Sequence, residues 1–176
     1  MPKIIVGLGN GKCYKGTRHN IGEDILASLK DRDVFRDEIE ALAGEKVFFV
    51  PTEGYYNTSG EYIGRKARFY KIDPAKDLLI ICDDFYLEFG TMRLRLEGSD
   101  GGNKGLKSII KHLGTSEFAR LRLGTDNGMK QNIDAEDFVL SKFNSSEIAD
   151  IPKITKEVEA KIKEWLERAK NSTDEQ

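Results

Sequence analysis

Several residue types are scarce in this chain of 176 residues, and each shortage excludes a class of protein. The chain has two cysteines and two histidines, and their positions give no spacing typical of metal ligands. We expect Cys13 and Cys82 to be free thiols, with Cys82 buried in a strand. No window of about eighteen apolar residues exists, so no transmembrane helix is expected. We therefore expect no metal, no other cofactor and no membrane partner.

The first residues give no sign of export, and the charge is close to balanced. The apolar run that ends at Leu8 is too short for a secretory signal and lacks a cleavage-like end. We expect a cytoplasmic monomer with one domain over residues 1–176. The net charge of −2 argues against a surface coated in positive charge, yet a local basic patch remains compatible with it. Between residues 91 and 122 the basic residues Arg93, Arg95, Lys104, Lys107, Lys111, Arg120 and Arg122 outnumber the acidic residues Glu97, Asp100 and Glu117.

Short apolar runs alternate with amphipathic segments along the whole chain. Apolar patterns predict strands at residues 3–8, 46–50, 78–82, 92–96 and 120–124. Periodic apolar positions predict helices at residues 20–31, 61–70 and 145–170, and another from the glycine-rich loop 98–102 through His112. Residues 38–42 fit a helix or a short strand pairing with residues 46–50, and we favour the strand. This order predicts one three-layer α/β domain, with a twisted mixed β-sheet flanked by helices, Trp165 in the core and a frayed tail over residues 171–176.

His19 lies in a polar loop just after the first predicted strand. Histidine exchanges protons near neutral pH, and one at a strand end among amide and hydroxyl groups is placed as a general base would be. The alternative is structural, with residues 17–22 beginning a helix that Asn20 caps. Asp83 and Asp84 end the central strand, where one carboxylate can meet His19 at the carboxyl edge of the sheet; alternatively, they form a turn or a helix cap. If the chain stays extended, Asp84 points to the face opposite Asp83.

Two asparagines and three arginines complete the polar candidates. Asn10 and Asn57 carry amides that can donate to a developing oxyanion or hold a water molecule. Both asparagines also suit turns or helix caps. Arg93 and Arg95 alternate onto one face of a strand, where they are either solvated or form, with Arg122 on another strand, a row that binds phosphates.

Several sequence blocks are informative as an ordered set. They are IIVGLGN, TRHNIG, PTEGYYNTSG, DDFYLEFGTMRLR, GSDGGNKGLKSIIKHLGT, FARLRLGT and DFVLSKF, and they span about residues 3–143. In this order they resemble the bacterial-type peptidyl-tRNA hydrolases. The resemblance implies a single-domain α/β enzyme that cleaves the ester between a nascent peptide's carboxyl group and the 3′-terminal ribose of tRNA. The implied partner is peptidyl-tRNA that has dropped off the ribosome, and the reaction recycles its tRNA.

The resemblance also implies roles for individual residues. His19 would be the catalytic base and Asp83 its orienting partner. Substrate binding would fall to Asn10, Tyr14, Tyr56, Asn57, Asn103 and Lys104. Among these, Asn10 and Asn57 would hold the substrate and the attacking water, and Tyr14 would face the 3′ end of the tRNA. The basic positions that grip tRNA phosphates would be Arg93, Arg95 and Arg122.

The chain departs from the family pattern in three places. The first loop reads GNGKCY where the family usually has GNPGxxY, so it lacks the proline and one residue before Tyr14. Asn103 and Lys104 replace the usual His-Asn pair, and Tyr56 stands where methionine is common. Because burying an ammonium group is costly, we expect the flexible Lys104 to swing outward and pair with a tRNA phosphate.

Three functions are compatible with these observations. The leading hypothesis is an active peptidyl-tRNA hydrolase, because the catalytic pair and both asparagines are intact. The alternative is an RNA-binding homologue of that family whose hydrolysis is weakened or lost through Lys104 and the shortened loop. A third hypothesis, a generic phosphate-binding module built on residues 98–105, is disfavoured because this loop lacks both nucleotide-binding glycine patterns. The loop is then either a flexible turn into a helix, or a segment whose backbone amides and following helix N-terminus lie near a tRNA phosphate.

Overall fold

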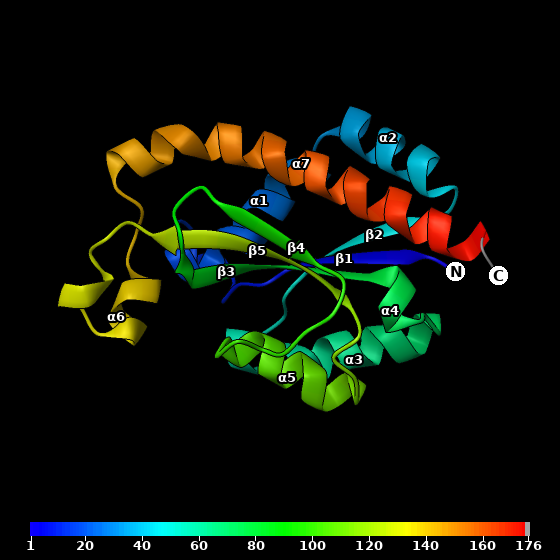
Figure 1. Cartoon of the computed structure of the whole chain (residues 1–176), viewed down its shortest axis with the longest axis horizontal. Helices are drawn as coiled ribbons and strands as arrows, with labels where there is room; N and C mark the ends of the chain where they lie inside the picture. Colours follow the sequence, from blue (N-terminus) through cyan, green and yellow to red (C-terminus); the bar gives the residue numbers. More distant parts are fainter. Residues whose placement is uncertain (175–176) are drawn as a thin grey trace.

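In the described part of the chain, a five-stranded sheet forms the middle layer, and helices cover both of its faces (Figure 1). The computed structural model describes residues 1–174, without the side chains of residues 130 and 171–174. The strands are β1 (Lys3–Gly7), β2 (Val47–Pro51), β3 (Leu78–Glu88), β4 (Met92–Arg95) and β5 (Ala119–Asp126). Their spatial order is β2-β1-β3-β5-β4, with β4 antiparallel to β5 and the other neighbours parallel. The predicted mixed sheet and α/β class are confirmed.

The longer helices form two outer layers. One layer holds α1 (Ile21–Lys30), α2 (Asp33–Ala43) and α7 (Ser145–Asp174), and the other holds α3 (Ser59–Tyr70) and α5 (Lys104–Leu113) (Figure 1). The connections contain the short helices α4 (Pro74–Asp77) and α6 (Ala135–Leu140) and the 3-10 turns η1 (Lys12–Tyr14), η2 (Arg18–Asn20), η3 (Tyr56–Thr58) and η4 (Lys130–Asn132). No helix among the described residues has both the length and the apolar character required to cross a bilayer.

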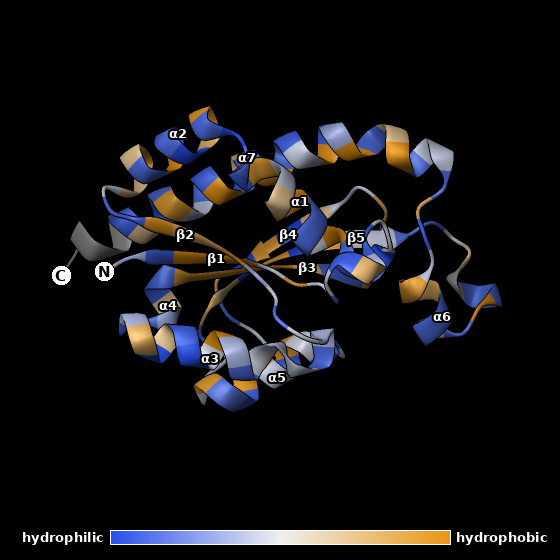
Figure 2. Cartoon of the chain, turned by 180° about the vertical axis from the view of Figure 1, so that it is seen from behind, coloured by the Kyte–Doolittle hydropathy of each residue, from blue (hydrophilic) through white to orange (hydrophobic). Residues whose placement is uncertain are grey.

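Alternate residues of the central strands face the two helical layers. Ile5 of β1 and Ile81 of β3 pack with α1, α2 and α7, whereas Val6 and Ile80 pack with α3 and α5. Both faces of these strands are therefore apolar, which explains why their sequences are continuous apolar runs. These runs are the orange stretches of the central strands in Figure 2. Trp165 of α7 is 1% exposed and belongs to the first of these two cores, as predicted.

The helix α2 corrects the expectation of a strand over residues 38–42. Phe35, Ile39 and Ala43 recur every four residues, and all three are buried in the core that α1 and α7 share. This spacing places one apolar stripe on a helix, whereas a strand needs alternate apolar positions. Gly44 ends the helix with a φ of 69°, a left-handed conformation that glycine adopts without strain. The strand prediction is wrong because so short a window does not separate the two periods.

Two other boundaries also differ from the predictions. β3 does not end at Asp84 but continues to Glu88, with a register shift against β5 between these two residues. α7 includes residues 171–174, where we expected a frayed tail. Residues 175–176, the rest of that expectation, lie outside the described residues. Pairing with β5 extends β3 beyond its apolar run, because strand length depends on neighbours as well as on local pattern.

The topology directs the functional side chains to the carboxyl ends of β1 and β3. The neighbours of β1 are β2 on one side and β3 on the other, so the strand order reverses there. In open α/β sheets, ligands bind outside the carboxyl ends of the strands at such a switch point. The start of α1 approaches both strands closely because Gly22 has no side chain, and a Cβ there would collide with the carbonyl oxygen of Ile81. The turn just before α1, which carries His19, therefore lies beside β3.

Candidate active site

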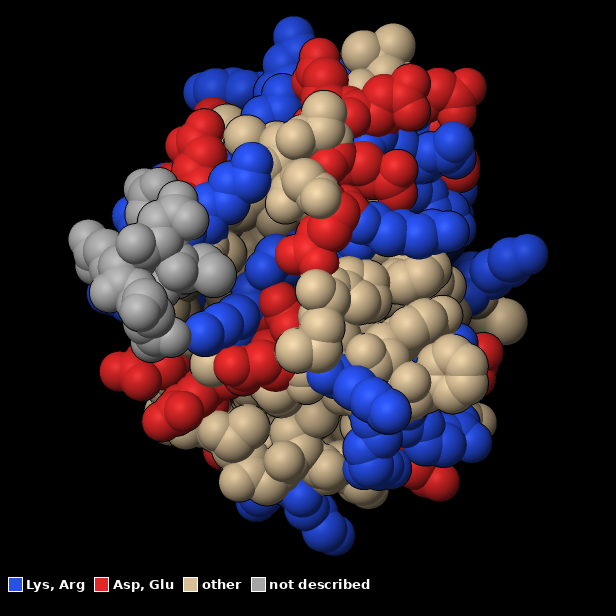
Figure 3. Space-filling model, turned by 90° about the vertical axis from the view of Figure 1, so that its right-hand side faces the viewer, with Lys and Arg blue, Asp and Glu red and all other residues tan. Residues whose placement is uncertain are grey.

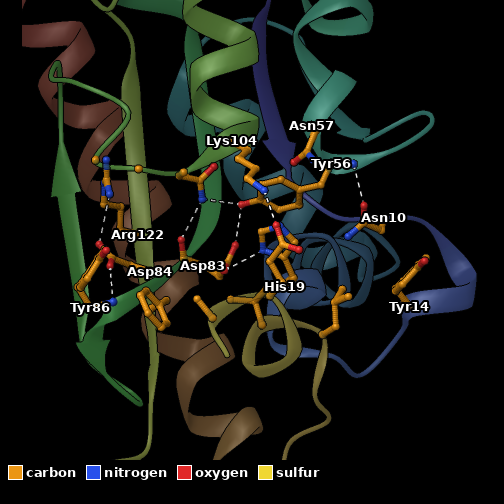
Figure 4. A pocket seen from close by; sticks show the side chains of 18 residues that line it. Asn10, Tyr14, His19, Tyr56, Asn57, Asp83, Asp84, Tyr86, Lys104 and Arg122 are labelled. Atoms are coloured by element: carbon orange, nitrogen blue, oxygen red, sulfur yellow. Dashed lines mark hydrogen bonds and ion pairs between the residues drawn. The ribbon is translucent and has the colours of Figure 1, made fainter. Parts of the chain in front are cut away.

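A pocket of about 380 Å³ opens at this edge of the sheet (Figure 4). It brings together most candidates predicted from the sequence: Asn10, Tyr14, His19, Tyr56, Asn57, Asp83, Asn103, Lys104 and Arg122. Arg93 and Arg95 do not line it, because they lie exposed on β4. Part of the wall is apolar and includes Phe85, Val139 and Leu140. The pocket therefore combines a polar centre with an apolar side.

His19 and Asp83 form the centre of this pocket. His19 lies in η2, and Asp83 lies in β3; their side chains are 15% and 3% exposed. His19 Nδ1 lies 2.9 Å from Asp83 Oδ2. A carboxylate at this distance fixes the orientation of the imidazole. The pair has the geometry of a general base with its orienting group.

Tyr56 packs against this pair and is 1% exposed. Its ring stacks on the His19 ring with centroids 3.5 Å apart and an angle of 18° between the planes. Its hydroxyl donates to Asp83 Oδ1 at 2.6 Å and accepts from Asn103 Nδ2 at 2.8 Å (Figure 4). Sequence analysis grouped Tyr56 and Asn103 with the substrate-binding residues. In the structure, their polar groups belong to the hydrogen-bond network of Asp83.

Arg18 holds the turn that carries His19, a role that the sequence analysis missed. The Arg18 and Glu147 side chains are 3% and 6% exposed, and they meet through two contacts, Nη1 to Oε1 at 2.7 Å and Nη2 to Oε2 at 2.8 Å. Nη1 also donates to the carbonyl of Thr125 at 2.9 Å. Burial raises the pKa of Glu147, but hydrogen bonds from Arg18 and from a backbone N–H outweigh it, so the pKa lies below its ordinary value. The local signal was an arginine beside the histidine, whereas Glu147 lies in a distant charged segment.

Asn10 and Asn20 tie the first loop to the site. Asn20 occupies the position before α1, but its side chain makes no cap bond, so the alternative in which Asn20 caps this helix does not hold. Instead, Asn20 Oδ1 accepts from the backbone N–H of Asn10 at 2.7 Å, and Asn20 Nδ2 donates to Asp24 at 2.8 Å. Asn10 Oδ1 accepts from the backbone N–H of Tyr56 at 2.8 Å. These bonds orient the Asn10 amide and keep its NH2 group as a donor.

Tyr14 and Asn57 stand at the rim. Asn57 is exposed and lies in η3, one residue before Thr58, which takes the position preceding α3. The alternative of a helix cap therefore does not hold for Asn57. Tyr14 is half-buried at the end of η1, in the shortened loop, and still lines the pocket.

Asp84 points away from His19, as the alternation of side chains along a strand predicts (Figure 4). Its Oδ2 lies 3.3 Å from Arg122 Nη1. Arg122 Nη2 also donates to the carbonyls of Ser99 at 3.1 Å and Asp100 at 3.0 Å. Arg122 thus anchors the glycine-rich loop, and its side chain is only 13% exposed. This internal engagement distinguishes it from the exposed arginines of β4.

The start of α5 contributes Asn103 and Lys104. Asn103 caps the helix, since its Oδ1 accepts from the N–H of Leu106 at 3.0 Å, as expected for a turn that opens a helix. Lys104 Nζ lies 2.7 Å from Glu136 Oε1 of α6, and the two side chains are 61% and 76% exposed. Lys104 is therefore directed across the pocket toward α6, with its ammonium group in solvent.

Two further predictions concern cysteines and metals. Cys13 is exposed and Cys82 is buried in β3, and both are free thiols, as expected. Burial raises the pKa of the Cys82 thiol well above its ordinary value, which keeps it unreactive. Over the described residues, no group of three or more His, Cys, Asp or Glu side chains is arranged to hold a metal ion.

The far end of the sheet has a different surface. Figure 3 views the end where the chain begins, and basic and acidic side chains are interspersed there between uncharged areas. Such a surface does not favour a polyanion. The exposed Arg93 and Arg95 lie elsewhere, on β4, where they pair with Arg122 and Arg120 of β5. Their side chains are on the same face of the sheet as the glycine-rich loop that Arg122 anchors.

Comparisons with known proteins agree on one family. A family model described as peptidyl-tRNA hydrolase matches residues 4–176. The peptidyl-tRNA hydrolase of Fusobacterium nucleatum is 40% identical over 93% of this chain and 89% of its own, and that of Chloroflexus aggregans is 40% identical over 96% of each chain. The crystal structure of peptidyl-tRNA hydrolase from Acinetobacter baumannii superposes with a TM-score of 0.78 at 29% identity, covering 97% of this chain and 91% of that one.

Proposed function

The chain belongs to the peptidyl-tRNA hydrolase family, and we propose that its pocket cleaves the ester between peptide and tRNA with a water molecule that His19 activates. The protein is accordingly a hydrolase, and peptidyl-tRNA is its substrate. The observation that carries the mechanism is the contact of 2.9 Å between His19 Nδ1 and Asp83 Oδ2 at the centre of an open pocket.

In this mechanism His19 takes a proton from water as the water oxygen attacks the ester carbonyl. The imidazolium that forms is stabilised by Asp83, whose carboxylate also holds Nδ1 and leaves Nε2 for the water. Breakdown of the tetrahedral intermediate expels the ribose hydroxyl of the tRNA, and the proton returns from the ring to that leaving oxygen. The pair thus acts first as a base and then as an acid.

The asparagines stabilise the charge that develops during the attack. Asn10 has its Oδ1 engaged by the backbone of Tyr56, so its NH2 group serves as a donor toward the oxyanion or the water. Asn57 contributes a second amide from the rim. The apolar side chains Phe85, Val139 and Leu140 suit the peptide, and Tyr14 suits the 3′ end of the tRNA.

The tRNA body binds along the side of the pocket where basic residues are exposed. Arg93 and Arg95 are free to contact phosphates, because both lie exposed on β4. Arg122 contributes less, since its guanidinium already binds Asp84 and two backbone carbonyls. We also propose that the protein acts as a monomer.

The alternative of an RNA-binding homologue without hydrolysis finds no support in the comparisons, since the matched relatives carry the name of the hydrolase. Lys104, the departure that motivated this alternative, pairs with Glu136 in solvent. It therefore leaves the contact between His19 and Asp83 undisturbed.

The test compares His19→Ala with His112→Ala on an N-blocked aminoacyl-tRNA. The chain has two histidines, and His112 is exposed on α5, outside the pocket lining, which makes it the matched control. Loss of the general base should lower the hydrolysis rate by about 10² to 10⁴, and His112→Ala should keep the wild-type rate. Hydrolysis at the wild-type rate by folded His19→Ala would refute the mechanism.

A further inference from the structure

Asp83 has two carboxylate oxygens, and each has a different partner. Oδ2 faces His19 Nδ1 at 2.9 Å, which is the contact used by the proposed mechanism. Oδ1 accepts a hydrogen bond from the hydroxyl of Tyr56 at 2.6 Å (Figure 4). A short bond from a hydroxyl to a carboxylate is among the stronger hydrogen bonds, because the acceptor is charged. The carboxylate is therefore held at both of its oxygens.

Asn103 determines the direction of the Tyr56 hydroxyl. Its Nδ2 donates to the tyrosine oxygen at 2.8 Å, while its Oδ1 is taken by the backbone N–H of Leu106 at 3.0 Å. A hydroxyl has one proton, so a hydroxyl that accepts from Asn103 gives that proton to Asp83. Burial, reinforced by the charge of Asp83, raises the pKa of Tyr56 well above its ordinary value. The hydroxyl therefore keeps the proton that it donates.

Packing fixes the ring of Tyr56 as firmly as hydrogen bonds fix its hydroxyl. The ring stacks on His19 at a centroid distance of 3.5 Å. It also lies against the backbone of Gly105, where a Cβ would collide with the ring. The side chain is 1% exposed. Little of the Tyr56 side chain is therefore left for a substrate to contact.

We propose that Tyr56 is a positioning residue that acts on the reaction through Asp83. Its hydroxyl holds the carboxylate so that Oδ2 faces His19 Nδ1, and its ring supports the imidazole from one side. The chain of contacts runs from the start of α5 through Asn103, Tyr56 and Asp83 to His19. This inference rests on the proposed function and assigns Tyr56 to the interior of the catalytic network, in place of the substrate contact that sequence analysis expected.

The first test compares Tyr56→Phe with Tyr55→Phe. Tyr56→Phe removes only the hydroxyl and keeps the stacked ring, and Tyr55→Phe makes the same change at a neighbour that is 69% exposed. Loss of a hydrogen bond to a charged group predicts a decrease of about tenfold in kcat. KM should stay within about twofold, because the hydroxyl of Tyr56 is bound to Asp83 and Asn103 and not offered to the substrate. An unchanged kcat, or a rise confined to KM, would overturn the proposal.

A double-mutant cycle separates action through Asp83 from a general effect on structure. In an Asp83→Asn background, Tyr56→Phe should change the single-turnover rate by less than about twofold, because the carboxylate that it orients is gone. The same decrease of about tenfold in both backgrounds would refute the proposed route. Tyr56→Met also removes the hydroxyl, and it takes the place of Tyr56→Phe if that variant does not fold.

A spectroscopic measurement needs no substrate. In wild-type protein at a pH where the ring is neutral, ¹⁵N NMR should find the His19 proton on Nδ1 in a single tautomer, because the positioned carboxylate accepts it. In Tyr56→Phe the tautomers should mix, while the exposed His112 provides the internal reference. A mixed tautomer in wild type, or an unchanged His19 spectrum in Tyr56→Phe, would overturn the inference.

These measurements keep the two proposals separate. Inactive His19→Ala together with fully active Tyr56→Phe would remove the positioning role and leave the hydrolase mechanism intact. If His19→Ala instead kept its activity, the mechanism would fail, and the NMR comparison would still decide whether Tyr56 orients Asp83.

Discussion

Replacing Glu147 by glutamine should destabilise the protein by about 3 kcal/mol, because it leaves the buried guanidinium of Arg18 without a compensating charge. Breaking a buried ion pair from one side costs roughly 3–5 kcal/mol. The lower end applies here, since the glutamine oxygen still accepts one hydrogen bond and Arg18 still donates to the carbonyl of Thr125. A folded domain is stable by only about 5–15 kcal/mol, so the change removes a large share of the total.

The matched control is Glu159→Gln. Glu159 also lies on α7 and pairs with Arg32 at 2.8 Å and with Lys163 at 3.1 Å, but these two cationic side chains are 50% and 35% exposed. Solvent-exposed pairs contribute about 0–1 kcal/mol. Urea unfolding with linear extrapolation should therefore separate the two variants clearly. The m-value should stay constant in both, because neither change alters the surface exposed on unfolding.

The pH dependence provides a second measurement of the same pair. The pKa of Glu147 is lower in the folded protein than its ordinary value of 4.5. Between the two pKa values, the unfolded state binds a proton at Glu147 and the folded state does not. The stability that Glu147 contributes is therefore complete above the unfolded pKa and is lost as the pH falls through the folded pKa. The difference between wild type and Glu147→Gln should therefore be constant above about pH 5.5 and shrink below about pH 4.5.

A cost below about 1 kcal/mol, equal to that of the exposed pair, would refute this account of Arg18. So would a difference between wild type and variant that grows as the pH falls, because that requires a raised pKa. Either result would mean that η2, and His19 with it, is held by its backbone contacts instead.

Three further predictions concern the site itself. Asp83→Asn should lower kcat by about 10² or more, because the ring loses its orienting carboxylate, and Asp84→Asn should lower it by less than about tenfold; equal effects would reverse their roles. Arg93→Gln and Arg95→Gln should each weaken tRNA binding irrespective of sequence and reduce the slope of log K against log salt by about one or less, and an unchanged slope would place the tRNA elsewhere. Lys104→Asn should keep kcat and weaken tRNA binding by a few-fold at most, as measured at saturating and limiting substrate; a large loss of kcat would show that the ammonium takes part in the reaction.

The sequence predicts correctly those elements whose apolar pattern matches the way they are buried in the fold. β1 and β3 are buried on both faces, so their runs are continuous and unmistakable. The prediction of a strand over residues 38–42 failed, because Glu38 to Ala41 alternate between charged and apolar residues within so short a window. Phe35 and Ala43, which complete the helical stripe, lie just outside that window. The helix α2 packs against α7, which is distant in the sequence, so no local pattern predicts this contact.

The site also has features that the sequence could predict and features that it could not. The motifs and the strand ends were sufficient to place His19 and Asp83 together, because both are set by the topology of parallel strands. The bond between Tyr56 and Asp83 and the pair between Arg18 and Glu147 depend on side-chain rotamers and on contacts between distant segments. Neither has a local pattern, so sequence analysis assigned Tyr56 to the substrate and gave Arg18 no role.

The arrangement of charges around His19 explains why Asp83 is suited to the proposed role of orienting and stabilising the imidazole ring. Among the other charged residues that line the pocket, Asp84 pairs with Arg122, and Lys104 pairs with Glu136. Each pair has no net charge, so its field at the ring is weak. In the contacts of the described residues, the Asp83 carboxylate has one partner besides His19, the neutral hydroxyl of Tyr56. Its negative charge is therefore not neutralised by a permanent cation, and in the proposed mechanism it remains available to the imidazolium that would form when His19 takes a proton from water.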